Sequence, residues 1–107
     1  MSSTLPPKPL TDGENIAKYK AAAQVANESL AKVFAAVSPG VTVLELCQIG
    51  DKAIEEGLIT QYRKAKLPRG VAFPTTVSIN NVVCHVSPLP SDPEAERKIA
   101  NGDVVKV

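Results

Sequence analysis

The chain has 107 residues, of which 44% are hydrophobic, and a net charge of +1 from 12 basic and 11 acidic side chains. This length suits one small domain, and the near-neutral balance excludes a chain-wide field that would attract nucleic acid or membranes. Any basic binding surface must therefore be local.

The two cysteines, Cys47 and Cys84, lack the spacing of a CxxC motif. Two unpaired thiols suit a reducing compartment better than a disulfide framework. No apolar run has the length of a signal sequence or of a membrane span. The composition therefore predicts a protein of the cytoplasm, and also of the nucleus, with no membrane partner.

Residues 1–10 contain three prolines, which predicts a flexible tail without fixed structure. Thr11 and Glu14 fit a capping box, so a first helix is expected to start there. Its apolar residues are spaced by threes and fours and predict one helical face: Ile16, Tyr19, Ala23, Ala26, Leu30, Val33 and Val37. Residues 38–40 should end this helix, and the alanine-rich face favours packing against a sheet or a second helix over a coiled coil.

Thr42 and Glu45 form a second capping-box pattern, which predicts a second helix through about Ile59. Its expected apolar face contains Val43, Leu46, either Ile49 or Gly50, Ala53 and Ile54. Cys47 belongs to the same side, so we expect a buried and unreactive thiol there.

The only cluster of cations lies between residues 61 and 70, and Pro68 and Gly70 indicate that this segment is a loop. Its members are Arg63, Lys64, Lys66 and Arg69. A solvated connector is one interpretation, and a loop that contacts phosphate groups is the other. No aromatic residue beyond Tyr62 is close in sequence, so base stacking is not predicted.

Residues 71–88 are rich in β-branched side chains and are expected to be extended, with a turn or strand break at Asn80-Asn81. The stretch contains the sole histidine, His85, either in a binding site or as a satisfied histidine of a core strand. In a strand, Cys84 and His85 would point to opposite faces, which disfavours a Cys–His dyad.

The last part of the chain contains turn signals followed by a short apolar run. Asp92 and Pro93 predict a capped helical turn through Ile99, and Asn101-Gly102 predicts a tight turn. Residues 103–107 should then begin a strand.

Four segments together resemble the type 2 branch of the methionine-aminopeptidase-like superfamily, whose fold is called the pita-bread fold. They are Phe73-Pro74-Thr75-x-x-Ser78-x-Asn80-Asn81-x-x-x-His85-x-x-Pro88, Lys18-Tyr19-Lys20, Leu46-Cys47-x-x-Gly50-Asp51 and Gly102-Asp103-Val104-Val105-Lys106-Val107. The residue Thr76 and the run Val83–Leu89 are similar to the proliferation-associated and curved-DNA-binding branch, which is described as lacking peptidase activity.

This resemblance implies an α+β fold in which residues 11–107 form the N-terminal part of a pita-bread domain, truncated before the fold is complete. Two helices would pack on a curved antiparallel sheet. The peptidases' metal ligands would all lie beyond the position of Val107, so no metal and no cofactor are expected.

The function that the resemblance implies is non-catalytic binding of nucleic acid or ribosomes, with Arg63, Lys64, Lys66 and Arg69 as phosphate-contact candidates. The alternative is the N-terminal piece of a type 2 methionine aminopeptidase, in which His85 matches a histidine of the substrate pocket.

Overall fold

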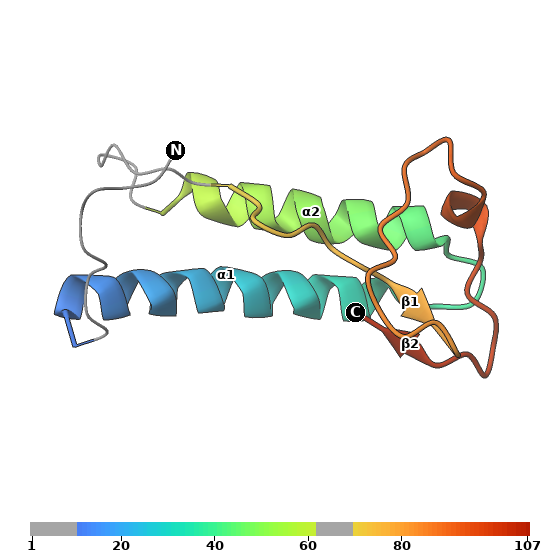
Figure 1. The fold of residues 1–107 in the computed structure, drawn as a ribbon, viewed down its shortest axis with the longest axis horizontal. Coiled ribbons are helices and arrows are strands. Elements are labelled where there is room, and N and C mark those ends of the chain that lie inside the picture. The colour runs from blue at the N-terminus through green and yellow to red at the C-terminus, as the bar shows by residue number, and fades with distance from the viewer. Residues whose placement is uncertain (1–10, 62–69) are drawn as a thin grey trace.

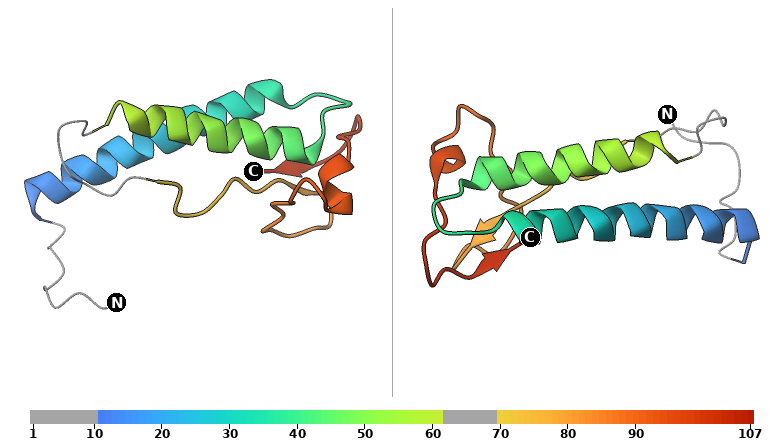
Figure 2. Two further views of the ribbon diagram at one scale, coloured as in Figure 1. Left: turned by 90° about the horizontal axis from the view of Figure 1, so that it is seen from above. Right: turned by 180° about the vertical axis from the view of Figure 1, so that it is seen from behind.

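The structure is a computed structural model and describes residues 11–61 and 70–107. Two helices, α1 (Gly13–Ala36) and α2 (Val43–Ile59), run side by side in opposite directions (Figure 1). The rest comprises β1 (Ser78–Ile79), the short 3-10 helix η1 (Pro93–Glu96) and β2 (Val105–Lys106). Figure 2 shows this C-terminal part gathered along one side of the helix pair, mainly near the end of α1 and the start of α2.

Helix α1 begins one residue later than the sequence predicted. Its N-cap is Asp12, whose Oδ1 accepts a hydrogen bond from the backbone N–H of Glu14 at 2.9 Å. The predicted capping box from Thr11 is therefore wrong. Aspartate caps a helix at least as well as threonine, and its negative charge is also favoured at a helix N-terminus.

The buried face of α1 is rotated around the helix from the predicted one. Val25, Ser29 and Val33 are its buried residues, whereas Tyr19 is 66% exposed. Most of the predicted apolar face consequently lies beside the contact with α2 and remains open to solvent.

Helix α2 agrees with the prediction in its bounds and in its cap. The Thr42 side chain accepts from the N–H of Glu45 at 3.1 Å, and the Glu45 carboxylate accepts from the N–H of Thr42 at 3.0 Å. The sequence left either Ile49 or Gly50 on the apolar face, and Gly50 is the buried one. A Cβ atom on Gly57 would lie 2.9 Å from a methyl carbon of Val25, so this glycine permits the close helix contact.

The two strands pair antiparallel, with Ser78 opposite Lys106 and Ile79 opposite Val105. Only this small part of residues 71–88 is strand, so the strand before the predicted break at Asn80 is shorter than expected. Asn80 and His85 have positive φ values of 55° and 69°, which end the extended backbone on each side of a short loop. The predicted break at Asn80 is confirmed.

A second connection ties the C-terminal part to the linker between the helices. The N–H of Ile99 donates to the carbonyl of Val41 at 2.8 Å, and the N–H of Val43 donates to the carbonyl of Arg97 at 2.9 Å. The helical turn before it is shorter than predicted, because η1 ends at Glu96 and not at Ile99.

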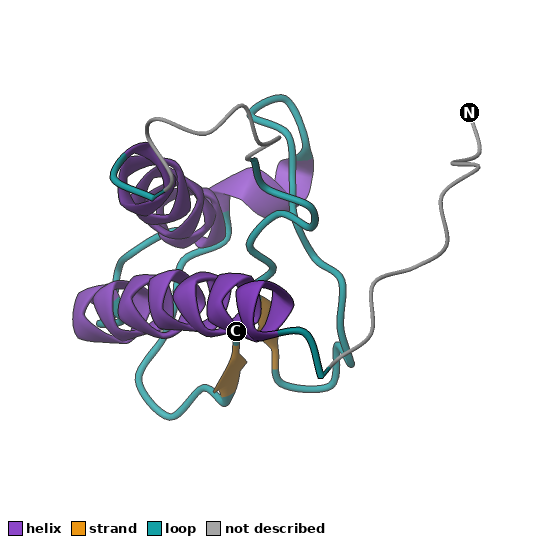
Figure 3. Cartoon of the chain, turned by 90° about the vertical axis from the view of Figure 1, so that its left-hand side faces the viewer, coloured by secondary structure: helices purple, strands orange, loops and turns teal. Residues whose placement is uncertain are grey.

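The core lies where the helix pair meets the sheet (Figure 3). It is formed by buried apolar side chains from α1, α2, the β1 region and the segment after η1: Val33, Val43, Leu46, Cys47, Val77, Ile79 and Ile99. The opposite end of the helix pair has few buried residues. The C-terminal part is thus fixed at one end of the molecule, which positions the loop that contains His85.

Candidate functional site

The loop between Asn80 and Val86 is held at both ends by hydrogen bonds. The N–H of Val77 donates to the carbonyl of Val86 at 2.8 Å, and the N–H of Val82 donates to the carbonyl of Ile79 at 3.1 Å. The N–H of Val86 lies 3.4 Å from the hydroxyl of the buried Ser78, which accepts from it. These bonds stabilise the left-handed backbone of His85, a conformation that costs a non-glycine residue roughly 1 kcal/mol or more.

Asn80 and Asp103 join this loop to the turn before β2. The Asn80 Nδ2 donates to Asp103 Oδ1 at 3.0 Å, while Asn80 Oδ1 accepts from the N–H of Val104 at 2.9 Å. The other oxygen of Asp103 accepts from the N–H of Ala100 at 2.8 Å. The bond from Ala100 and then the bond from Asn80 hold the pKa of Asp103 below its ordinary value of 3.8.

The His85 ring contacts the ring of Phe73, with centroids 5.5 Å apart and planes tilted by 58°. Phe73 is 62% exposed and His85 is also exposed, so the pair presents aromatic surface to solvent. His85 is therefore not a buried histidine of a core strand. Nothing in the sequence spacing signals this contact, because it depends on the left-handed turn at His85.

Both rings are attached to anchored backbone. Close to Phe73, the N–H of Thr75 donates to the Asp51 carboxylate on α2 at 2.7 Å. The Thr75 side chain also fills the space beside Gly50, where a Cβ atom would collide with it. The stretch that follows Phe73 is thus fixed to α2, as the stretch that follows His85 is fixed to Val77 and Ser78.

The two thiols have different environments. Cys84 is exposed. The ring of the neighbouring His85 contacts Phe73. Cys47 is buried in the core, and burial, with the nearby charge of Asp51, raises the pKa of its thiol to about 11. The prediction of a buried, unreactive Cys47 is confirmed for its burial and supported by this pKa.

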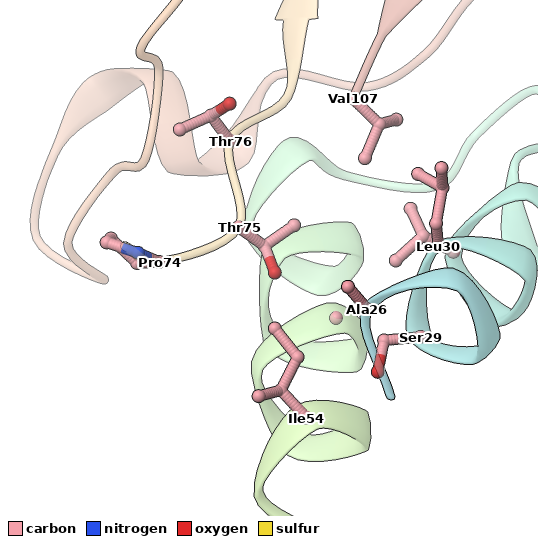
Figure 4. Close-up of a pocket in the computed structure, with 10 residues that line it drawn as sticks. Ala26, Ser29, Leu30, Ile54, Pro74, Thr75, Thr76 and Val107 are labelled. Atoms are coloured by element: carbon pink, nitrogen blue, oxygen red, sulfur yellow. The ribbon is translucent and has the colours of Figure 1, made fainter. Parts of the chain in front are cut away.

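A groove of about 210 Å³ lies between α1, α2 and residues 74–76 (Figure 4). Leu30 and Ala26 line it from α1, Ile54 from α2, and Val107 closes one side. Its walls are mainly apolar, and it adjoins the exposed apolar residues of α1. The groove contains no titratable side chain among its lining residues and therefore offers no groups for acid–base catalysis.

The donor groups in the described residues do not fit a dinuclear metal centre. No three His, Cys, Asp or Glu side chains within residues 11–61 and 70–107 converge as a metal site would require. Asp51 and Asp103 accept backbone hydrogen bonds, and the His85 ring packs against Phe73. Within the same residues, neither helix has the length and apolar character needed to cross a bilayer.

The predicted phosphate-contact residues fall outside the part of the chain that the structure describes. Arg63, Lys64, Lys66 and Arg69 lie in the gap between Gln61, which follows α2, and Gly70. Their role stays a prediction from the sequence.

Two antiparallel helices with a small antiparallel sheet at one end correspond to part of a pita-bread fold. Residues 17–107 match metallopeptidase family M24. A solved structure of a thermophilic Arx1 superposes with a TM-score of 0.83 at 37% identity, over 88% of this chain and 26% of the Arx1 chain. The chain belongs to the M24 family, and the predicted fold class is confirmed.

Two curated relatives show which part of the family the chain resembles. It is 43% identical over 100 residues to ERBB-3 binding protein 1 of Solanum tuberosum, over 92% of this chain and 25% of that protein. It is 40% identical over 98 residues to the curved DNA-binding protein of Schizosaccharomyces pombe, over 92% of this chain and 26% of that protein. The resemblance to the proliferation-associated and curved-DNA-binding proteins is confirmed, and the chain spans about a quarter of their length.

Proposed function

We propose that this chain acts without catalysis and binds the phosphate backbone of nucleic acid, either as DNA or structured RNA or within ribosomes. The similarity to the curved DNA-binding protein over 92% of this chain carries the proposal. The name of that relative states a DNA ligand, and its sequence is similar along both helices and the C-terminal part. The proposed location is the cytoplasm, and also the nucleus.

The basic segment supplies the chemistry for such binding. Arg63, Lys64, Lys66 and Arg69 place four cations within seven residues, in a chain whose net charge is only +1. A local cluster can contact several phosphates at once and releases their condensed counterions, which favours binding to any sequence. We assign the phosphate contacts to these four side chains.

The test compares two variants that lose the same charge at different places. Changing Arg63, Lys64, Lys66 and Arg69 together to Ala should strongly weaken binding to duplex DNA and to salt-washed ribosomes. The control changes four exposed lysines elsewhere, Lys20, Lys32, Lys52 and Lys98, to Ala. Equal losses in the two variants would show that overall charge is responsible, and no loss in the first would contradict the assignment.

A second candidate function rests on the relatives named as peptidases. The chain is 31% identical over 90 residues to a methionine aminopeptidase of Methanothermus fervidus, over 84% of this chain and 41% of that protein. On this hypothesis the chain would be a part of a metallopeptidase, with His85 in the substrate pocket.

Metal binding tests whether this chain by itself can hold a metal centre; the peptidase candidate does not require it, because its metal ligands would lie beyond the position of Val107. Because no three His, Cys, Asp or Glu side chains converge within the described residues, we expect no tight binding of Co²⁺, Mn²⁺ or Zn²⁺ by this chain. The measurement is metal content after dialysis from a metal-loaded sample. Stoichiometric metal retained with sub-micromolar affinity would favour the peptidase hypothesis.

A further inference from the structure

A row of exposed apolar side chains follows α1, on a side of the helix different from that of its buried residues. Its members are spaced by threes and fours, which places them on one side of the helix: Ile16, Tyr19, Ala23, Ala26, Leu30 and Phe34. None of them carries a charge, and all are exposed. Over most of the length of α1, this row has no partner among the described residues.

The order of side-chain sizes in the row is nearly the same from either end. Large side chains lie at both ends, and small ones lie in the middle. Taken inward from the ends, the row pairs large with large and small with small: Ile16 with Phe34, Tyr19 with Leu30, and Ala23 with Ala26. A two-fold axis between the two alanines would bring each residue opposite its pair, as an interface between identical copies requires. The alanines also let two helices approach closely at the axis.

The charges of α1 agree with a second copy in the antiparallel direction. Because the row is uncharged, covering it leaves no ionised group without water. A strongly acidic or basic partner would find no counter-charge in it. Antiparallel helices also place the partly positive N-terminus of one beside the partly negative C-terminus of the other, which is weakly favourable.

The area of the row predicts the strength of this contact. Tyr19 is 66% exposed and Phe34 is 56% exposed, so two copies together bring four rings that are more than half exposed. Covering those rings removes about 400–600 Å² from water, since a buried aromatic side chain covers about 150–250 Å². The aliphatic members raise the total toward about 1,000 Å², the lower limit for a specific interface. We therefore expect a dimer that dissociates on dilution.

We propose that α1 forms an antiparallel, two-fold symmetric contact with α1 of a second copy of this chain, through the row from Ile16 to Phe34. This inference goes beyond the proposed nucleic-acid binding and does not depend on it. Ala26 and Leu30 belong both to the row and to the groove of Figure 4, so the contact would also cover the α1 wall of that groove.

A charge at the centre of the row tests the contact. Ala26→Glu would place the carboxylates of the two copies close together near the axis, where like charges repel. The control is Ala35→Glu, the same change on the opposite side of α1, because nine residues are about two and a half turns. Sedimentation velocity should show a dimer Kd raised at least about tenfold by Ala26→Glu and unchanged by Ala35→Glu. Circular dichroism and thermal unfolding check that both variants fold.

Cross-linking through cysteines tests the direction of the two helices. In the antiparallel pair, position 16 of one copy lies beside position 34 of the other, whereas the two copies of position 16 are about 27 Å apart along the axis. Cys84→Ser removes the exposed native thiol, and Cys47 is buried with a thiol pKa of about 11. In this background, Ile16→Cys chains and Phe34→Cys chains with tags of different size are mixed and treated with a short bis-maleimide.

We expect the mixed dimer, and no cross-linking by either chain alone. Lys32→Cys in place of Phe34→Cys is the control and should give no mixed dimer, because two residues turn the helix by about 200°. Cross-linking of each chain with itself, without the mixed dimer, would show a parallel contact and overturn the proposal.

The sedimentation results can also contradict the proposal. Equal weakening by Ala26→Glu and Ala35→Glu would show unspecific association. A wild-type chain that stays monomeric at about 0.1 mM, where a dimer with a Kd of about 10 µM would predominate, would overturn the contact. If that monomer dimerised only after removal of residues 1–10, those residues would be the occupant of the row instead of a second copy.

Discussion

Asp103 shows how a single carboxylate fixes the C-terminal strand. It accepts one hydrogen bond from the Ala100 backbone and one from the Asn80 side chain, and both are available only in the folded chain. These bonds favour the ionised form, so the pKa of Asp103 is lower in the folded than in the unfolded state.

The pH dependence of stability follows from this shift. A carboxylate with a lowered folded-state pKa contributes its full stability above the unfolded value, ordinarily 3.8, and loses it as the pH falls through the lower folded value. We expect the free energy of unfolding of Asp103→Asn to fall less on acidification than that of the wild type, because the variant lacks this carboxylate. Urea unfolding at pH 6 and at pH 3 measures this effect. The difference in free energy of unfolding between wild type and Asp103→Asn should be smaller at pH 3.

An equal difference at both pH values would contradict this role for the Asp103 charge. Glu56→Gln is a suitable control, because Glu56 is exposed and its recorded ion pair with Lys52, at 3.9 Å, is weak. That variant should change the acid dependence little.

Prediction from the sequence works at the residue scale where the interaction is local. The capping box of Thr42 and Glu45 spans three residues and was predicted correctly. The Phe73–His85 contact and the Asn80–Asp103 bond join distant residues, and both depend on a left-handed backbone. Residue types alone do not give the direction of such side chains.

Gly50 and Gly57 let helix α2 pack closely against its neighbours. Substitution of Gly50 can be compared with substitution of Gly13, which has open space around it. A Cβ atom on Gly50 would collide with the Thr75 side chain, whereas a Cβ atom on Gly13 of α1 would have no atom within 4 Å. Each change from Gly to Ala gains helix propensity, by about 1 kcal/mol at an interior position.

We therefore expect opposite effects of the two substitutions on the free energy of unfolding. Gly13→Ala should be neutral or slightly stabilising, whereas Gly50→Ala should destabilise, by about 1–3 kcal/mol, the range typical of overpacking. Chemical denaturation measures both. Equal stabilisation by the two variants would show that Thr75 does not pack against α2 as described.

At the scale of elements, the sequence predicts the two helices and places α2 correctly. The face of α1 was predicted incorrectly because its apolar residues cover more of the helix than α2 can contact. The helices approach closely where Gly57 meets Val25, and apolar spacing alone gives glycine no weight in such a contact. The strands are shorter than expected because Asn80 and His85 interrupt the β-branched run.

The molecule as a whole exposes a row of apolar side chains along α1 that none of its described residues cover. Ile16, Tyr19, Leu30 and Phe34 are exposed along α1, beside the groove closed by Val107. Soluble monomers seldom expose apolar patches of large area, and such patches promote association. The chain matches about a quarter of the length of ERBB-3 binding protein 1 and of the curved DNA-binding protein.

We expect the isolated chain to self-associate as its concentration rises. Tyr19→Lys with Phe34→Lys should reduce this association without lowering thermal stability, because both side chains are exposed in the folded chain. Sedimentation velocity over a range of concentrations measures the effect. A monodisperse monomer at all concentrations for the wild type would show that the exposed face does not drive association.

Fold class and family membership could be predicted from the sequence because the motifs between Phe73 and Pro88 are long and specific. For nucleic-acid binding, the sequence predicts only a basic cluster, because charged residues can be read from it directly whereas contacts between distant side chains cannot. The exposed contact between Phe73 and His85 arises from the fold.

The salt dependence of nucleic-acid binding tests the central claim most directly. Four phosphate contacts by Arg63, Lys64, Lys66 and Arg69 predict that log K for duplex DNA falls with log salt with a slope of about −3.6, from about −0.9 per phosphate. Replacing the four side chains by Ala should flatten this slope and weaken all DNA sequences alike. A wild-type slope retained by that variant, or a slope near zero in the wild type, would contradict the claim.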